Sequence, residues 1–315
     1  MLPSDLLEWD DIASESYSLK KNLIEDSHAE IRLFSSEKKP RHYSSAPYFY
    51  DGGVSFKGNE IHEDTYKALR ELLVNEKLEF ILLKTRRAIH DNDHGFIKTD
   101  HSYFTFMLDL SIGEEKVWKN KLKSQTRNQV RKAEKQNFTI KFGNKELLSD
   151  FYKVISEAWR DLGTPTHSRK FYQLIIERMK EKAAIAVIYH EGKPVSCALL
   201  LMVDNVIYHP YSCSLNSYKS SCVNNLLYWE IIKYACENNF LSFDMGRSRK
   251  DQGTYKYKKS WGAEPIALFY NYLLREDVAM PSFDSVFYKY ATTAWKFMPL
   301  FLANRLGPSL IKNIL

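Results

Sequence analysis

The chain has 315 residues, of which 44% are hydrophobic and 14% are aromatic. This composition supplies enough apolar side chains for a core, so it excludes a collagen-like chain, a disordered acidic tail and a low-complexity chain. The formal net charge is +6, and no apolar run approaches the roughly 20 residues that cross a bilayer. The acidic start lacks the basic and apolar regions of a secretory signal. We therefore predict a cytoplasmic protein.

The first half of the chain, residues 1–112, alternates short apolar runs with turn signals. Tyr66, Leu69 and Leu73 have helical spacing, whereas short runs of aromatic, β-branched and leucine residues are typical of strands. These patterns predict strands over 30–35, 80–83 and 104–110 and a helix over 63–73. The segment from His90 to Gly95 has turn chemistry, and we expect a turn there rather than a metal loop.

The second half, residues 113–275, has a readable order of elements. We predict β-α-α-β-β-β-α-β-α-β, in which a basic, aromatic segment over 253–261 precedes the last strand. The predicted strands are 138–142, 184–189, 194–203, 206–214, 241–245 and 265–273, and the long helices are 145–162, 168–182 and about 221–237. The tail, residues 276–315, is predicted to be an amphipathic helix pair broken at Pro299 and Gly307. It either packs back on the body or contacts a membrane surface.

Positive charge is concentrated in two windows. The first runs from Lys116 to Lys135 and carries a net +7, and the second runs from Arg247 to Lys259 and carries +5. Without these windows the chain is mildly acidic, a pattern that favours an anionic ligand over a general affinity for nucleic acid. The first window is predicted to be one helix with an unbroken i, i+4 row of basic residues: Lys119, Lys123, Arg127, Arg131 and Lys135. Such a row is either a solvated face or a phosphate-binding surface.

Four cysteines are present, and none has C-x-x-C spacing. Cys197, Cys213, Cys222 and Cys236 lie in apolar or helix-like stretches, so we expect free thiols rather than a metal site or disulfides. The sequence also lacks G-x-S-x-G, the P-loop, G-x-G-x-x-G and H-E-x-x-H. These absences leave little support for a hydrolase, a kinase or a dehydrogenase.

Three segments resemble one family. Phe243 to Ser248 followed by Gly253 to Gly262, the Arg127-Asn128-x-x-Arg131-Lys132-Ala133 helix and the Pro47 to Gly53 segment are similar to the FemAB-like group of the GNAT acyltransferase superfamily. That group contains peptidoglycan-bridge aminoacyltransferases built from two GNAT-like halves. The resemblance implies an α/β fold with mixed sheets and a tandem duplicated GNAT-like architecture. The Pro47 segment looks like that of an exopolysaccharide-associated branch.

The resemblance implies amide-bond formation. An aminoacyl or acyl group would pass from an activated carrier, aminoacyl-tRNA or an acyl thioester such as acyl-CoA, to an amine of a cell-wall or polysaccharide precursor. No tightly bound cofactor and no metal is expected. The alternatives are an acyl-CoA-dependent N-acetyltransferase acting on a small molecule and a non-catalytic binding protein that keeps the fold. The sequence leaves open the acyl group, the acceptor and whether the chain is active.

Candidate catalytic residues follow from the matched segment. Lys258 falls on the family position implied in stabilising the oxyanion of acyl transfer. Tyr255 is a candidate proton donor to the leaving atom, or a core tyrosine. Asp244 at a strand end either positions or deprotonates the amine, or caps a turn.

Candidate donor-binding residues surround these positions. Arg247 and Arg249 suit bidentate binding of phosphate or carboxylate, and Trp261 is expected to pack the site. Ser221 marks the expected start of the helix whose N-terminus holds pyrophosphate in GNAT enzymes, although the usual glycine-rich loop is missing. The members of the basic row assigned to the carrier are Lys123, Arg127 and Arg131.

Overall fold

The computed structural model describes the whole chain except residues 37–40, 59–60, 90–96, 251, 282–285 and 313–315, and it also omits the side chains of 286–289. The segment from His90 to Gly95 therefore lies outside the described residues. The chain divides into two compact units. Unit 1 comprises residues 1–104, 266–285 and 310–315, and unit 2 comprises 105–265 and 286–309.

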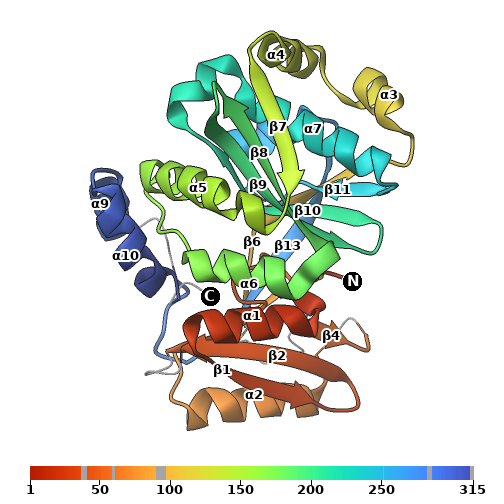
Figure 1. Cartoon of the computed structure of the whole chain (residues 1–315). Coiled ribbons are helices and arrows are strands. Elements are labelled where there is room, and N and C mark those ends of the chain that lie inside the picture. Colours follow the sequence, from red (N-terminus) through yellow and green to blue (C-terminus); the bar gives the residue numbers. More distant parts are fainter. Residues whose placement is uncertain (37–40, 59–60, 90–96, 251, 282–285, 313–315) are drawn as a thin grey trace. The chain divides into compact units, whose positions relative to one another are not determined.

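Unit 1 is a sheet with a helix on each face. Its elements are α1 (Leu7–Tyr17), β1 (Leu19–Glu25), β2 (Ala29–Ser36), β3 (His42–Ser45), β4 (Val54–Phe56), α2 (Glu63–Asn75), β5 (Phe80–Thr85) and most of β13 (Glu264–Leu274). The strand order is β1-β2-β3-β5-β13, and α1 and α2 lie on opposite sides of β1 and β2 (Figure 1). Side chains alternate along β2, so Ile31 and Leu33 pack against α2 while Phe34 packs with α1. The sequence did not predict α1 or β1.

Unit 2 has the order of elements expected from the sequence. Its sheet runs β6-β11-β10-β9-β8-β7 and is antiparallel except between β10 and β11. The strands are β6 (Ile97–Asp109, from residue 105), β7 (Phe138–Gly143), β8 (Ala183–His190), β9 (Lys193–Val203), β10 (Val206–Ser214), β11 (Ser242–Asp244) and the two-residue β12 (Ser248–Arg249). The helices are α5 (Leu148–Leu162), α6 (Arg169–Met179), α7 (Val223–Glu237) and α8 (Gly253–Lys259).

Helices cover both faces of this sheet. Seven consecutive residues of β8, from Ala183 to Tyr189, are buried, and α5 and α7 both pack against β8, β9 and β10. Burial on both faces explains why these strands read as continuous apolar runs rather than alternating ones. The predicted mixed α/β class is confirmed.

The units differ from the predicted halves in two strands. Residues 107–109 of β6 pair with β11 in unit 2, and residues 269–274 of β13 pair with β5 in unit 1. Both pairings join segments far apart in the chain, so a boundary drawn along the sequence does not reproduce them.

The prediction of one continuous helix through the first basic window is wrong. A short helix, α3 (Glu114–Lys116), continues as a π-helical turn over Val117–Lys121, and α4 (Ser124–Glu134) begins after an extended Leu122. Figure 1 shows α3 and α4 as separate helices. The i, i+4 row is therefore interrupted between Lys119 and Lys123.

The tail forms α9 (Val286–Lys296) and α10 (Leu300–Ile311). Within unit 2, α9 packs against α5, and the Arg160 Nη1 atom of α5 donates a hydrogen bond to the Met298 carbonyl at 3.0 Å. Among the described residues, no helix combines the length and the hydropathy required to cross a membrane.

Candidate functional site

Lys258 is a buried lysine on α8. Only 6% of this residue is exposed. Its Nζ atom donates hydrogen bonds to the carbonyl oxygens of Gly246 at 2.8 Å and Arg247 at 3.0 Å. Burial lowers the pKa of Lys258 to about 7, while the nearby Asp244 carboxylate acts in the opposite direction. Lys258 therefore gains or loses a proton near neutral pH, as is common at catalytic positions.

Asp244 holds the turn that supplies these carbonyls. It is fully buried at the end of β11, and its Oδ1 accepts hydrogen bonds from the Thr105 hydroxyl and, at 2.9 Å, from the Gly246 N–H. Gly246 has a φ of +71°, a left-handed conformation that favours glycine. The geometry makes Asp244 a positioning residue for the turn that binds Lys258.

The pairing of the two parallel strands β10 and β11 ends beside this turn. β10 pairs with β11 only over Val206–Tyr208, whereas its register with β9 shifts after Tyr208 and continues to Ser214. His209 lies at this irregularity. β11 ends at Asp244, so the main-chain atoms of β10 beyond Tyr208 are not paired with β11 in the described chain.

His209 is a site residue that the sequence reasoning missed. It is buried, and its Nε2 atom has no hydrogen-bond partner among the described residues. Burial, followed by the Lys258 charge, lowers the pKa of His209 to about 3, so the imidazole is neutral at pH 7. An unpaired buried nitrogen of this kind costs about 1–3 kcal/mol. The signal available in the sequence was a His-Pro pair inside an otherwise apolar strand.

Phe106 contributes an aromatic ring near the lysine. The Lys258 Nζ atom lies 5.8 Å from the ring centroid of Phe106, and Tyr255 meets the same ring edge-on at 4.9 Å. Trp261 is fully buried with its ring 5.6 Å from that of Tyr228. Trp261 therefore packs against Tyr228 in the interior, whereas Tyr255 is only partly buried.

The N-terminus of α7 is hydrogen-bonded to α8, the helix that carries Lys258. α7 begins at Val223, and Ser221 belongs to the 3-10 turn before it rather than to the helix. The Asn224 Nδ2 atom donates to the Tyr257 hydroxyl at 3.0 Å, which ties the first turn of α7 to α8. The partial positive charge of a helix N-terminus therefore lies close to the element that carries Lys258.

The start of α4 is bonded to the end of α8. The Lys123 N–H donates to the Ser260 carbonyl at 3.0 Å, and the Thr126 hydroxyl donates to the same oxygen at 3.0 Å. The side chain of Lys123 is exposed at this junction. Both basic windows thus belong to unit 2 and meet where α4 begins.

The other basic residues of α4 have different partners. The Arg127 guanidinium donates to the carbonyls of Leu122 and Trp118, so it stabilises the break between the helices. Arg131 is exposed and lies over the Trp118 ring at 5.5 Å. It is eight residues beyond Lys123, which is about 12 Å along a helix. Of the three, Lys123 lies nearest to the α8 junction.

Arg247 and Arg249 follow the turn at Gly246. Arg247 is exposed and Arg249 is partly buried on β12. The main-chain carbonyl of Arg247 accepts a hydrogen bond from Lys258, so this arginine adjoins the lysine. This placement suits a residue that contacts a charged part of a substrate.

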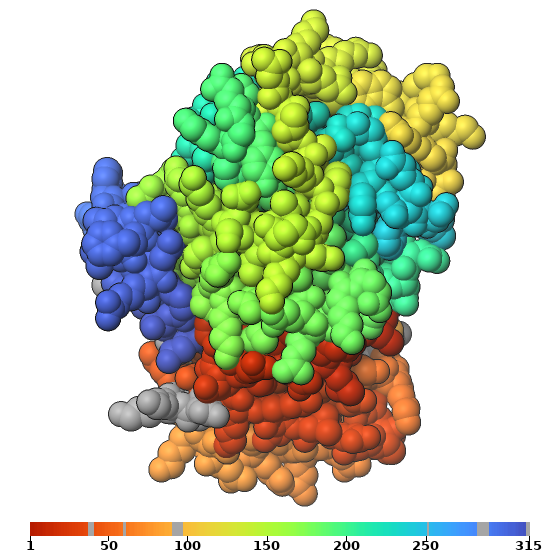
Figure 2. Space-filling model, in the orientation of Figure 1, coloured from red at the N-terminus to blue at the C-terminus, as the bar shows by residue number. Residues whose placement is uncertain are grey.

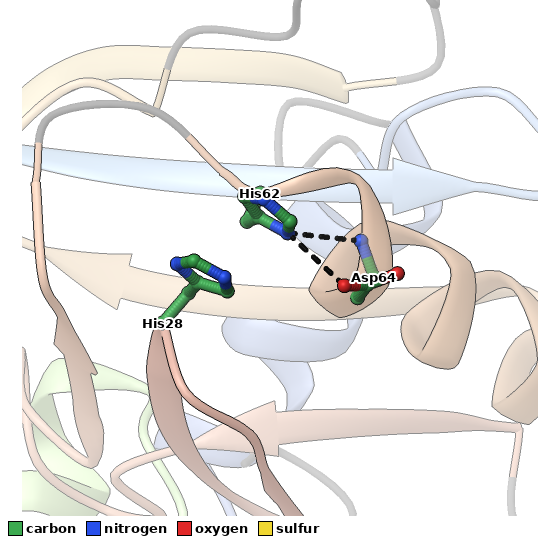
Figure 3. A group of neighbouring side chains, drawn as sticks. All are labelled: His28, His62 and Asp64. Carbon is green, nitrogen blue, oxygen red and sulfur yellow. Dashed lines mark hydrogen bonds and ion pairs between the residues drawn. The ribbon is translucent and has the colours of Figure 1, made fainter.

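One group of side chains in unit 1 has metal-binding chemistry. Ligand atoms of His28, His62 and Asp64 lie within 4.8 Å of one another (Figure 3), and the two imidazole rings are stacked with centroids 3.5 Å apart. Asp26 holds this group together, because its carboxylate accepts from the His28 N–H and from the Thr65 hydroxyl. The group contains none of the predicted site residues.

Unit 1 also contains a pocket of about 230 Å³ lined in part by Lys84, Arg86 and Arg87. The Arg86 Nε atom forms an ion pair with the buried Asp51. The described lining residues of this pocket include none of the predicted catalytic residues.

Comparisons with known proteins agree with the fold of unit 2. Residues 120–259 match the family model described as an acetyltransferase (GNAT) domain. Over 96 residues the chain is 31% identical to a lipid II:glycine glycyltransferase from Staphylococcus epidermidis, and the same enzyme from a second strain matches equally well. This match covers 27% of the chain and spans less than a quarter, 23%, of the relative's length.

Solved structures share the fold at low sequence identity. FemX superposes with a TM-score of 0.62 at 14% identity and covers 87% of this chain and 92% of its own. A tandem GNAT protein from the clavulanic acid biosynthesis pathway has a TM-score of 0.58 at 10% identity, with 86% and 87% of the two chains covered. L-PGS from Bacillus licheniformis has a TM-score of 0.55 at 12% identity, with 94% and 98% covered.

The GNAT domain match, the likeness to a glycyltransferase and the fold shared with FemX converge on one family. They support the resemblance of the chain to FemAB-like proteins of the GNAT acyltransferase superfamily, whose domain model matches residues 120–259.

Proposed function

We propose that this chain forms an amide bond by transferring an aminoacyl or acyl group from an activated carrier to an amine of a cell-wall or polysaccharide precursor. The observation that carries the proposal is the buried Lys258, held by two carbonyls beside the point where the pairing of β10 with β11 ends. The donor is aminoacyl-tRNA or an acyl thioester, and the reaction takes place in the cytoplasm. The glycyltransferase relative supports a cell-wall acceptor.

The reaction needs a hydrogen-bond donor that stabilises the negative charge on the attacked carbonyl oxygen. The acceptor nitrogen attacks the acyl carbon, the carbonyl oxygen takes the electron pair, and the carbon–oxygen or carbon–sulfur bond to the carrier then breaks. A protonated Nζ carries three N–H bonds, of which two point to the carbonyls of Gly246 and Arg247. The third is available for the developing oxyanion in a water-poor site, where one such donor contributes about 100- to 1000-fold in rate.

The remaining residues take positions around that centre. Asp244 orients the turn, and the neutral His209 offers its Nε2 atom to a substrate N–H or O–H. Tyr255 protonates the leaving atom, water takes the proton that the amine loses, and the tyrosine regains its proton from water. Arg247, Arg249, Lys123 and Arg131 contact the anionic carrier, and the N-terminal segment of α7 near Ser221 adds its partial charge. Arg127 supports the start of α4, and Trp261 packs against Tyr228 in the interior.

Label transfer tests the proposal. Radiolabelled aminoacyl-tRNA and acyl-CoA are offered separately with a panel of cell-wall and polysaccharide precursors, and label in an amide product from the first donor identifies the aminoacyltransferase. Transfer from acyl-CoA to small amines alone would indicate the N-acetyltransferase alternative. Transfer from neither donor to any acceptor would refute the enzyme proposal and favour a binding protein.

The variant Lys258→Ala tests how much the lysine contributes to the rate. We expect turnover to fall about 100- to 1000-fold with donor affinity nearly unchanged. Lys256→Ala, on the exposed side of the same helix, is the matched control and should retain the wild-type rate. Full activity of a folded Lys258→Ala variant would remove the lysine from the chemistry.

A further inference from the structure

The tail carries a row of large apolar side chains that face solvent. Phe297 and Phe301 are 84% and 71% exposed, and Tyr290 is 73% exposed. Leu306 and Leu310 on α10 are also exposed. Isolated exposed apolar residues are ordinary, but a concentration of them within one short segment is typical of an interaction surface.

These exposed side chains do not take part in the packing of the tail against unit 2. Trp295, Ala303 and Ile311 are buried, and the close approach of Gly307 to the main chain of Thr166 holds α10 against unit 2. The helices therefore have an inner face that anchors them and an outer apolar face. Figure 1 shows α9 and α10 side by side, and their surface lies open in the space-filling view of Figure 2.

The charge of the tail has a single sign. Residues 286–315 contain no Asp or Glu, and their charged residues are Lys289, Lys296, Arg305 and Lys312. Lys296 and Arg305 are exposed beside the apolar row. Exposed aromatic and leucine side chains combined with basic residues only are typical of helices that lie in the interface of an anionic bilayer.

We propose that the outer face of α9 and α10 docks on an anionic lipid surface, with Phe297 and Phe301 inserted among the acyl chains and Lys296 and Arg305 against the headgroups. The helices lie on the membrane rather than cross it, because α10 spans only 12 residues. The link to the proposed function is that a docked enzyme would meet a lipid-linked acceptor. The docking itself stands on the tail alone.

Vesicle flotation with the full-length protein tests the docking. We expect the protein to float with vesicles made of equal parts of phosphatidylglycerol and phosphatidylcholine, and much less with pure phosphatidylcholine. The double variant Phe297→Ser/Phe301→Ser should lose binding. Each of Lys296→Glu and Arg305→Glu should weaken it at least about fivefold, since a basic residue near such a surface contributes that much.

Matched controls use exposed residues outside the tail. Val74→Ser removes an apolar side chain that is 64% exposed, and Lys193→Glu reverses a charge at the exposed first residue of β9; both should bind vesicles as the wild type does. Wild-type protein that stays unbound to anionic vesicles would overturn the proposal. So would a concentration-dependent dimer in sedimentation that the double variant abolishes, because a second copy would then cover this face.

The two proposals fail separately. If the double variant transfers label to a water-soluble acceptor at the wild-type rate but does not float, the reaction is intact and only docking is lost. If the wild type floats but transfers nothing, the docking stands and the proposed function falls.

Discussion

The lowered pKa of Lys258 predicts a specific dependence of stability on pH. In the unfolded chain the lysine titrates near its usual value of 10.5, whereas burial brings the folded pKa to about 7. Between these two values the unfolded chain binds a proton that the folded chain does not, so the free energy of unfolding contributed by this group rises with pH. The destabilisation of the folded chain by the buried lysine is complete below pH 7 and is lost as the pH approaches 10.5.

The magnitude follows from the two pKa values. The full shift corresponds to about 5 kcal/mol. Over the accessible range from about pH 6 to about pH 9, the linkage relation gives an increase of about 2.5 kcal/mol in the free energy of unfolding. Other titrating groups also contribute, and they cancel when the wild type is compared with Lys258→Met, which keeps an unbranched side chain without the charge.

Denaturant unfolding at several pH values, followed by tryptophan fluorescence and circular dichroism together, measures this difference. We expect the stability of the wild type relative to Lys258→Met to rise by about 2.5 kcal/mol from about pH 6 to about pH 9. Lys256→Met, at an exposed position of α8, should follow the wild-type curve. Parallel curves for the wild type and Lys258→Met would refute a buried lysine that titrates near neutral pH.

Three further predictions test other parts of the structure. Activity that needs a charged Lys258 should fall as the pH rises through about 7, while Lys258→Arg should not show this loss, as pH–rate profiles would reveal. Gly262→Ala should lower the free energy of unfolding by roughly 2–4 kcal/mol, since a Cβ there lies 2.6 Å from the Lys121 carbonyl oxygen at a φ of +77°; wild-type stability would contradict this packing. In unit 1, Arg32→Met should cost about 2 kcal/mol because it removes the buried partner of Asp10 at 2.9 Å and leaves that carboxylate with the exposed Lys21 at 2.8 Å, and an unchanged denaturation midpoint would count against the Arg32–Asp10 ion pair.

The elements of unit 2 were predictable because periodicity is a local property of the chain. The strands from β7 to β10 agree with the predicted ranges to within one residue at each end. Their apolar runs reflect burial on both faces, and short turns separate β8, β9 and β10. In contrast, β1 has only two buried residues among seven, which is too weak a pattern to indicate a strand.

The break between α3 and α4 was not predictable from residue spacing. Every residue from Lys116 to Lys135 is compatible with a helix. The chain is nevertheless extended at Leu122, where the Lys123 N–H reaches the Ser260 carbonyl and Arg127 binds the freed carbonyls. Hydrogen bonds to a distant segment overcame the local preference for a continuous helix.

By itself, the sequence determined which residues carry charge, where apolar periodicity changes and which lysine matches the family segment. Only the tertiary structure decided that this lysine is buried, because the atoms that remove water from Lys258 come from Phe106, the turn at Gly246 and the irregular edge of β10. A pKa reports the solvation of a group, and solvation depends on neighbours that pairing of distant strands brings together.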